Sequence, residues 1–171
     1  INNISKKGLS LLPENFKYSA NEEDPDAIIV RSADLHQMEF QENIRIIARA
    51  GAGTNNIPIE KCSEKGIIVC NAPGANANAV KELVLCGLLL GSRDIIGAAS
   101  WTKNLTVTEN IEKEVEAGKK AFAGPEIFGK TLGVIGLGAV GELVASMGVD
   151  LGMKVIGYDP YLSIKNALHL N

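Results

Sequence analysis

A glycine-rich turn between an apolar strand and an apolar helix places the tightest limit on how this chain can fold. The turn lies in the segment Thr131-Leu-Gly-Val-Ile-Gly-Leu-Gly-Ala-Val-Gly141. Its first half is an apolar run, a helical pattern follows over residues 139–151, and a second apolar run covers residues 153–158. Strand, tight turn, helix and strand in this order predict a parallel β-α-β unit of the dinucleotide-binding kind.

Each glycine of this turn has a separate physical task. Gly136 permits the sharp turn out of the strand, and Gly138 leaves room for a pyrophosphate to approach the backbone. Gly141 lets the helix pack closely on the sheet. A glycine turn that binds nothing is the plain alternative, but the strand, helix and second strand around it favour a cofactor site.

The helix after the turn and the acid after the second strand complete the predicted site. Ala139 and Val140 open the helix, where unpaired N–H groups and the positive end of the helix dipole favour a phosphate. Asp159 ends the second strand, where its carboxylate can accept hydrogen bonds from the adenosine ribose. Because that carboxylate would repel a 2′-phosphate, the sequence predicts NAD rather than NADP as the cofactor.

Two other glycine patterns fit a nucleotide less well. Residues 124–131 match the triphosphate-binding pattern G-x-x-x-x-G-K-T, but Lys130 leads into a strand rather than a helix. Pro125 also removes one of the amides that the phosphates would need. Residues 51–56 lack the third glycine and a long following helix, so we interpret them as a ligand-facing loop at the carboxyl end of a strand.

The first part of the chain alternates short apolar runs with helical segments, which predicts a parallel sheet in an α/β fold. The runs are β-branched without strict polar alternation, as is typical of strands buried on both faces. The break Asn71-Ala-Pro-Gly74 indicates a domain boundary, so we predict domains over residues 1–72 and 73–171. The strands are predicted over residues 27–30, 44–48 and 66–70, and the helices over residues 8–12 and 58–65.

A long apolar helix is predicted over residues 76–93. Because apolar residues lie on most of its faces, we expect it to be buried. No strong turn signal closes it, and residues 94–122 continue as mostly helical sequence that becomes polar. Its charge-free stretch, residues 83–92, is too short to cross a bilayer, so no membrane partner is expected.

Charge and cysteine content argue against several classes of protein. The 171 residues carry 17 Lys and Arg against 20 Asp and Glu, a net charge of −3 without a basic cluster, which argues against a nucleic-acid partner. No basic segment followed by an apolar run and a cleavage site opens the sequence, so we expect no secretion signal. The three cysteines form no Cys-x-x-Cys pair, which argues against a structural metal site or disulfide framework and favours the cytoplasm.

Three linked motifs resemble a known family. Residues 47–57, 66–76 and 129–141 are similar, in order and spacing, to the D-isomer-specific 2-hydroxyacid dehydrogenases. The resemblance implies a flavodoxin-like parallel-sheet substrate domain in residues 1–72, followed by the first β-α-β part of a Rossmann NAD-binding domain. Within the family, the sequence most resembles members that oxidise D-3-phosphoglycerate in serine biosynthesis. The resemblance to this family also implies that the protein forms a homo-oligomer, either a dimer or a tetramer.

The resemblance implies substrate-binding residues in the first domain. Arg31 and Ser32 match a motif whose arginine contacts the acidic end of the substrate, a role that a planar guanidinium suits. Ala52 and Gly53 match a loop whose amides hold the substrate carboxylate, and Asn76 matches an asparagine near the cleft between the family's two domains. The alternatives are a surface arginine for Arg31 and a helix N-cap for Asn76.

The family's catalytic arginine, glutamate and histidine have no counterpart in this chain. A doubly wound domain has about six strands, and only two are predicted after residue 130. In the family, a histidine is the base that removes the proton of the substrate hydroxyl, and neither His36 nor His169 suits this role. We therefore assign no catalytic residue and expect the 171-residue chain alone to lack turnover.

The sequence leaves one alternative for the substrate and one for the class of protein. Ala33 stands where a second basic residue can follow the Arg31 motif, so another D-2-hydroxy acid is an alternative substrate. A non-catalytic NAD-sensing protein, similar to the corepressors that resemble this family, is the alternative from another class.

Overall fold

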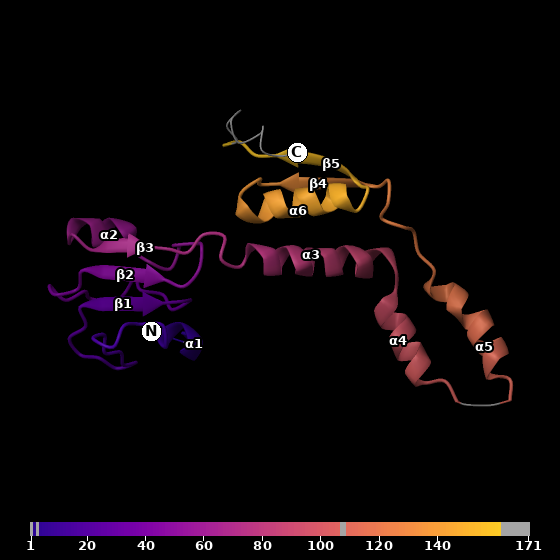
Figure 1. Ribbon diagram of the computed structural model, residues 1–171, viewed down its shortest axis with the longest axis horizontal. Helices are drawn as coiled ribbons and strands as arrows, with labels where there is room; N and C mark the ends of the chain where they lie inside the picture. The colour runs from indigo at the N-terminus through magenta and orange to yellow at the C-terminus, as the bar shows by residue number, and fades with distance from the viewer. Residues whose placement is uncertain (1, 3, 107–108, 162–171) are drawn as a thin grey trace. The chain divides into compact units, whose positions relative to one another are not determined.

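The computed structural model describes residues 2, 4–106 and 109–161, and the chain divides into two compact units, Ile1–Asn76 and Ala77–Asn171 (Figure 1). Each unit holds its own parallel sheet. The expected α/β class with parallel sheets is therefore confirmed. The domain boundary after residue 72 and the binding roles of the two domains stay predictions, and His169 lies outside the described residues.

The first unit is built on a three-stranded parallel sheet in the order β1-β2-β3. Its register pairs Ala27 with Ile46 and Ile46 with Ile68, so the carboxyl ends of all three strands lie at the same edge. The elements are α1 (Lys6–Leu9), β1 (Ala27–Val30), β2 (Ile46–Arg49), α2 (Ile59–Glu64) and β3 (Ile68–Cys70).

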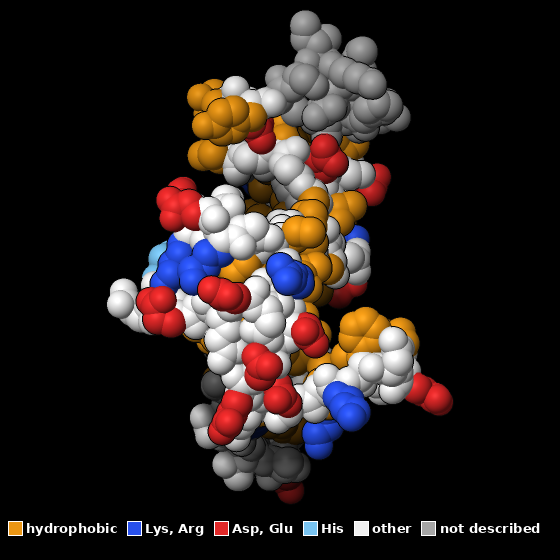
Figure 2. Space-filling view, turned by 90° about the vertical axis from the view of Figure 1, so that its left-hand side faces the viewer, with side chains coloured by type: hydrophobic (Ala, Val, Ile, Leu, Met, Phe, Trp, Pro, Cys, Tyr) orange, Lys and Arg blue, Asp and Glu red, His pale blue; other side chains and the backbone are white. Residues whose placement is uncertain are grey.

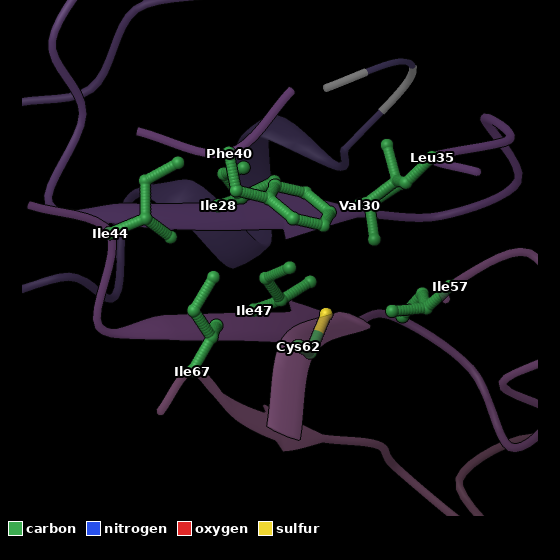
Figure 3. Close-up of a cluster of buried hydrophobic side chains, with 9 residues drawn as sticks. All are labelled: Ile28, Val30, Leu35, Phe40, Ile44, Ile47, Ile57, Cys62 and Ile67. Carbon is green, nitrogen blue, oxygen red and sulfur yellow. The ribbon is translucent and has the colours of Figure 1, made fainter. Parts of the chain in front are cut away.

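The core of this unit lies against one side of the sheet. Figure 3 shows its side chains gathered between the strands, α2 and the connecting loops. The other side is covered only in part: Ile68 is 63% exposed, whereas Ile29, Ile46 and Ala48 are half-buried. The expectation of strands buried on both faces is therefore wrong for the described part of the chain, because the elements present leave the second face partly uncovered. The core residues are Ile28, Val30, Leu35, Phe40, Ile44, Ile47, Ile57, Cys62 and Ile67.

The second unit has one helix packed on a two-stranded parallel sheet and a second helix packed on the first. The strands are β4 (Thr131–Ile135) and β5 (Lys154–Tyr158), joined by α6 (Ala139–Asp150) as the β-α-β pattern predicts. Helix α6 lies between the strands and α3 (Ala77–Ser92) (Figure 1). Gly148 permits the close approach of α6 to the strands, since a methyl group on this residue would lie 2.8 Å from Leu132 Cδ2 of β4.

Helix α3 departs from its expected burial. One side packs through Val84, Leu85 and Leu88 against the α6 core, whereas Leu83 on another side is 72% exposed. The expectation of a buried helix is therefore wrong in the isolated chain, because α6 covers only one of its faces.

The helix ends at Ser92, one residue before its predicted end at residue 93. Asp94 begins α4 (Ile95–Lys103), and its carboxylate accepts a hydrogen bond from the Gly97 N–H at 2.8 Å, an N-cap that the sequence analysis missed. After α5 (Ile111–Gly118), the short helix η1 (Lys119–Phe122) returns to α4, where the Trp101 and Phe122 rings lie 5.4 Å apart.

A membrane-spanning helix needs a certain length and apolar composition. Over the described residues no helix is by itself long and apolar enough to cross a membrane, and α3 and α4 meet those two criteria only as a pair bent by 69° at their junction.

Charged side chains of both signs are mixed on the face drawn in Figure 2. One ion pair joins Lys61 Nζ to Glu39 Oε1 at 2.9 Å and lowers the pKa of Glu39. Hydrogen bonds from the His36 backbone N–H and ring lower the pKa of Asp34. Burial raises the pKa of the Cys62 thiol, so we infer that it is a packing residue rather than a nucleophile.

Candidate functional site

The carboxyl edge of the three-stranded sheet brings together four of the five predicted substrate residues. Arg31 and Ser32 directly follow β1, and Ala52 and Gly53 lie in the loop that follows β2. Because β1 and β2 are parallel neighbours, both loops leave the sheet at the same edge. Ligands of open parallel sheets bind at this edge.

Backbone hydrogen bonds tie the loops of this edge to one another. The Ala50 N–H donates to the Val30 carbonyl at 2.8 Å, which links the end of β2 to β1. The Ala72 N–H donates to the Gly51 carbonyl at 2.9 Å, which links the segment after β3 to the loop after β2. The edge is therefore a connected surface rather than a set of separate loops.

Free donors remain in the loop after β2. The Ala52 carbonyl accepts from Asn71 Nδ2 at 2.7 Å, which holds the loop from its outer side. In the part of the chain that the structure describes, no group accepts a hydrogen bond from the N–H of Ala52 or Gly53. These two N–H groups can therefore serve a carboxylate, as the resemblance implies.

Arg49 is a member of this edge that the sequence analysis missed. Its Nε donates to the Arg31 carbonyl at 3.1 Å. Its guanidinium lies against the loop after β2, since a methyl group on Gly51 would lie 3.0 Å from Arg49 Cζ. The signal was present in the sequence: Arg49 ends β2 just before the glycine loop, as Arg31 directly follows β1.

The two arginines give this edge an unneutralised positive charge. Neither Arg31 nor Arg49 forms an ion pair with an acid among the described residues. A guanidinium binds carboxylate or phosphate oxygens in a planar, two-pronged arrangement. The edge is thus suited to a small ligand with more than one anionic group.

Asn56, in the segment after β2, links that segment to the loop after β1. It is 8% exposed, and its Nδ2 donates to the Ala33 carbonyl at 2.7 Å. Its Oδ1 is buried without a hydrogen-bond partner among the described residues. Because removal of the Asn56 side chain would leave the partly buried Ala33 carbonyl without this hydrogen bond, Asn56 has a structural role at this edge.

Asn76, the fifth predicted substrate residue, has a different setting. It is exposed, directly precedes α3, and makes no hydrogen bond with another described residue. The structure thus gives no side-chain cap by Asn76, and its contact with a substrate stays a prediction.

The glycine turn of the second unit has the geometry that its sequence pattern requires. Gly136 has a φ of +88°, a left-handed conformation that glycine adopts without strain. The Gly136 N–H donates to the Tyr158 carbonyl at 2.7 Å, which extends the pairing of β4 with β5. Gly141 lies directly on the turn: a methyl group there would overlap the Gly136 carbonyl oxygen and lie 2.9 Å from its carbon.

The start of α6 presents free donors beside this turn. No acceptor among the described residues is bonded to the N–H groups of Gly138, Ala139 or Val140. Nothing within 4 Å would meet a methyl group on Gly138, so the space beside it is open. Open space, free N–H groups and the positive end of a 12-residue helix together fit a pyrophosphate.

Asp159 is tied to the glycine turn more directly than the sequence indicated. Its Oδ2 accepts from the Leu137 N–H at 2.7 Å, and its Oδ1 accepts from the Tyr161 N–H at 2.8 Å. Each carboxylate oxygen can accept more than one hydrogen bond, so both retain capacity for ribose hydroxyls. Asp159 therefore holds the turn in place and also stands where the adenosine ribose is expected.

The segment 124–131 lacks the structure of a triphosphate-binding loop. Lys130 leads into β4, and its carbonyl accepts from the Lys154 N–H at 2.8 Å. The lysine therefore precedes a strand rather than a helix, as expected from the sequence. Over the described residues, no three His, Cys, Asp or Glu side chains are grouped so that they could hold a metal ion.

Comparison with known proteins establishes the family. The model of the D-isomer specific 2-hydroxyacid dehydrogenase catalytic domain matches residues 11–151. The chain therefore belongs to the D-isomer-specific 2-hydroxyacid dehydrogenase family, which confirms the resemblance of the three motifs.

Individual relatives carry two different activities in their names. The chain is 42% identical over 142 residues to a D-3-phosphoglycerate dehydrogenase of Methanocaldococcus jannaschii, covering 81% of this chain and 25% of the relative. It is 45% identical over 138 residues to a hydroxypyruvate reductase of Thermotoga maritima, covering 79% of this chain and 42% of the relative.

A solved structure supports the same fold. The chain resembles the NAD+-bound 3-phosphoglycerate dehydrogenase of Entamoeba histolytica with a TM-score of 0.56 and 33% identity, over 84% of this chain and 40% of that one. The chain thus spans a quarter to about two-fifths of the length of the relatives that it matches.

Proposed function

We propose that the protein to which this chain belongs oxidises D-3-phosphoglycerate with NAD, as a step of serine biosynthesis. The observation that carries this proposal is the pair of arginines, Arg31 and Arg49, at the carboxyl edge of the sheet without an acidic partner among the described residues. D-3-Phosphoglycerate carries both a phosphate and a carboxylate, and two guanidinium groups suit two anionic groups.

The residues of this chain would bind rather than catalyse. NAD, when bound, accepts the hydride that leaves C2 of the hydroxy acid, and a base takes the hydroxyl proton, which yields the 2-oxo acid. In the second unit, the N–H groups of Ala139 and Val140 would hold the pyrophosphate, and Asp159 the ribose. In the first unit, Arg31 and the loop after β2 would hold the acidic groups of the substrate. We assign no catalytic acid or base to this chain.

A second candidate substrate is D-glycerate, whose oxidation yields hydroxypyruvate. The 45% identity to a hydroxypyruvate reductase favours it. The two candidate substrates differ only in the phosphate group. The affinity that Arg31 and Arg49 add for a phosphate therefore decides between them.

The full-length protein should be assayed with D-3-phosphoglycerate, D-glycerate and D-lactate, each with NAD and NADP. We expect kcat/KM for D-3-phosphoglycerate to exceed that for D-glycerate at least about 30-fold, since a lost charged hydrogen-bond partner costs about 2 kcal/mol. We also expect NAD to be preferred over NADP because of Asp159. Residues 1–171 alone should show no turnover.

Other results of this assay would replace the proposal. A preference for D-glycerate would assign the second candidate. NADH binding without turnover of any of the three acids by the full-length protein would favour a non-catalytic NAD-sensing protein.

We also propose a cytoplasmic homo-oligomer formed through exposed apolar residues of α3 and α4. Leu83 is 72%, Ile96 66% and Ile95 49% exposed. Exposed apolar groups of this size on neighbouring helices are typical of a surface that a second copy covers. Leu83→Asp should lower the mass of the full-length protein measured by light scattering, whereas Leu11→Asp, at a residue that is 80% exposed in the first unit, should not. An unchanged mass for Leu83→Asp would contradict this interface.

A further inference from the structure

In the loop of residues 31–33, here called the Arg31 loop, the three backbone N–H groups are all bound by one side chain, that of Asn2. Asn2 Oδ1 accepts hydrogen bonds from the N–H groups of Arg31, Ser32 and Ala33 at 3.4, 3.3 and 3.3 Å. Asn2 Nδ2 donates to Ser32 Oγ at 2.9 Å. The three N–H contacts are long because they share one oxygen, so their effect comes from convergence on one point rather than from any one bond.

Two further side chains hold the carbonyls of the same loop. Arg49 Nε donates to the Arg31 carbonyl, and Asn56 Nδ2 donates to the Ala33 carbonyl. The backbone of the Arg31 loop is therefore bonded on both its donor and its acceptor sides. The guanidinium of Arg31 is left without a partner among the described residues.

The conformation of Asn2 fits this contact. Its φ is +49°, in the left-handed region, which asparagine tolerates better than most residues. Asn2 also offers an acceptor and a donor on one short side chain, and the Arg31 loop uses both. Alanine could replace neither bond.

We propose that Asn2 is a positioning residue for substrate binding, which holds the Arg31 loop so that the Arg31 guanidinium is preorganised for the acidic end of the substrate. This inference rests on the proposed function, because it takes Arg31 as a substrate contact. A loop that is already ordered loses less conformational entropy when a ligand binds, so the effect of Asn2 falls on affinity.

The neutral charge of Asn2 is part of the proposal. Three converging N–H groups would bind an anionic oxygen more strongly than a neutral one. An aspartate at this position would therefore keep the loop in place, but it would add a negative charge beside Arg31 and weaken the attraction for an anionic substrate. Asn2→Ala thus removes both kinds of bond, whereas Asn2→Asp keeps an acceptor for the three N–H groups, gives up the donor to Ser32 Oγ and changes the charge.

The test uses the full-length protein with D-3-phosphoglycerate as the probe. We expect Asn2→Ala to raise KM about 5- to 20-fold with kcat within about 2-fold, because the contact acts equally in the ground state and the transition state. The N–H groups of residues 31–33 should exchange with solvent faster in this variant. Asn2→Asp should raise KM at least as much while these N–H groups stay protected.

Asn43→Ala is the matched control. Asn43 Nδ2 donates to the Pro25 carbonyl at 3.1 Å, so this change also removes an asparagine bond to backbone, but before β1 and β2 rather than after them. KM should not change in this variant. If Asn2→Ala changed KM no more than Asn43→Ala in an active enzyme, the inference would fall and the proposed function would stand.

Calorimetric binding of D-3-phosphoglycerate separates the inference from the proposed function. If the wild-type protein bound D-3-phosphoglycerate without oxidising any acid, and Asn2→Ala weakened that binding, the proposed function would fall and the inference would stand. If the wild-type protein neither bound nor oxidised it, both would fall.

Discussion

Replacement of Gly141 by alanine should greatly weaken NAD binding by the full-length protein. The added methyl group would overlap the Gly136 carbonyl oxygen, and both groups belong to backbone that cannot rotate away as a side chain can. The start of α6 must then move off the turn, together with the N–H groups of Ala139 and Val140 that are proposed to hold the pyrophosphate. We expect affinity for NAD to fall at least about 100-fold, and the free energy of unfolding to fall by about 1–3 kcal/mol.

Two neighbouring glycines make matched controls for this change. Nothing within 4 Å would meet a methyl group on Gly133 or Gly138. Gly133→Ala should therefore leave NAD affinity unchanged, since residue 133 lies within β4. Gly138→Ala should keep the free energy of unfolding but weaken NAD binding, because its methyl group fills the space proposed for the pyrophosphate. NAD titration measures the affinity, and urea unfolding measures the free energy of unfolding. A Gly141→Ala variant that bound NAD within about 3-fold of wild type would contradict the proposed site.

The β-α-β unit was predictable because its determinants are local. A glycine at a positive φ, an apolar run of strand length and a helical pattern each act within a few residues of sequence. The structure accordingly has β4, the turn and α6 where the sequence predicted them, with Gly136 at φ +88°.

The remaining members of the substrate edge depend on contacts between distant segments. Arg49 and Asn56 reach the Arg31 loop only because β1 and β2 are neighbours in register, and Asn2 reaches it from a segment 29 residues away. A single sequence indicates strands but not which loops meet beyond their ends. The second role of Asp159 has the same origin, because its bond to the Leu137 N–H requires β4 and β5 to pair.

Burial of the strands and of α3 was mispredicted for a different reason. An apolar run indicates that a surface needs cover, but not which element or which molecule supplies the cover. Leu83, Ile68 and Ile156 are all more than 60% exposed in the isolated chain. Asp94 is a contrasting case, since its N-cap signal was local but was masked by helical sequence on both sides.

Replacement of Arg31 by alanine should raise KM for D-3-phosphoglycerate about 10- to 100-fold in the full-length protein. The expected size follows from the loss of a charged hydrogen-bond partner, which costs about 1.5–3 kcal/mol. Because the guanidinium would bind an acidic group that takes no part in hydride transfer, kcat should change less than about 3-fold. Arg31→Lys should recover only part of the affinity, since an ammonium keeps the charge but loses the planar two-pronged geometry.

Arg45→Ala is the matched control, and it decides between a binding role and a surface arginine. Arg45 directly precedes β2, so it lies at the amino edge of the same sheet that carries Arg31 at its carboxyl edge. Both changes remove one positive charge from the first unit, so a general electrostatic effect would raise KM equally in the two variants. A site at the carboxyl edge would raise KM in Arg31→Ala alone. Equal KM values for Arg31→Ala and wild type would make Arg31 a surface arginine, and the proposed phosphate or carboxylate contact would then rest on Arg49.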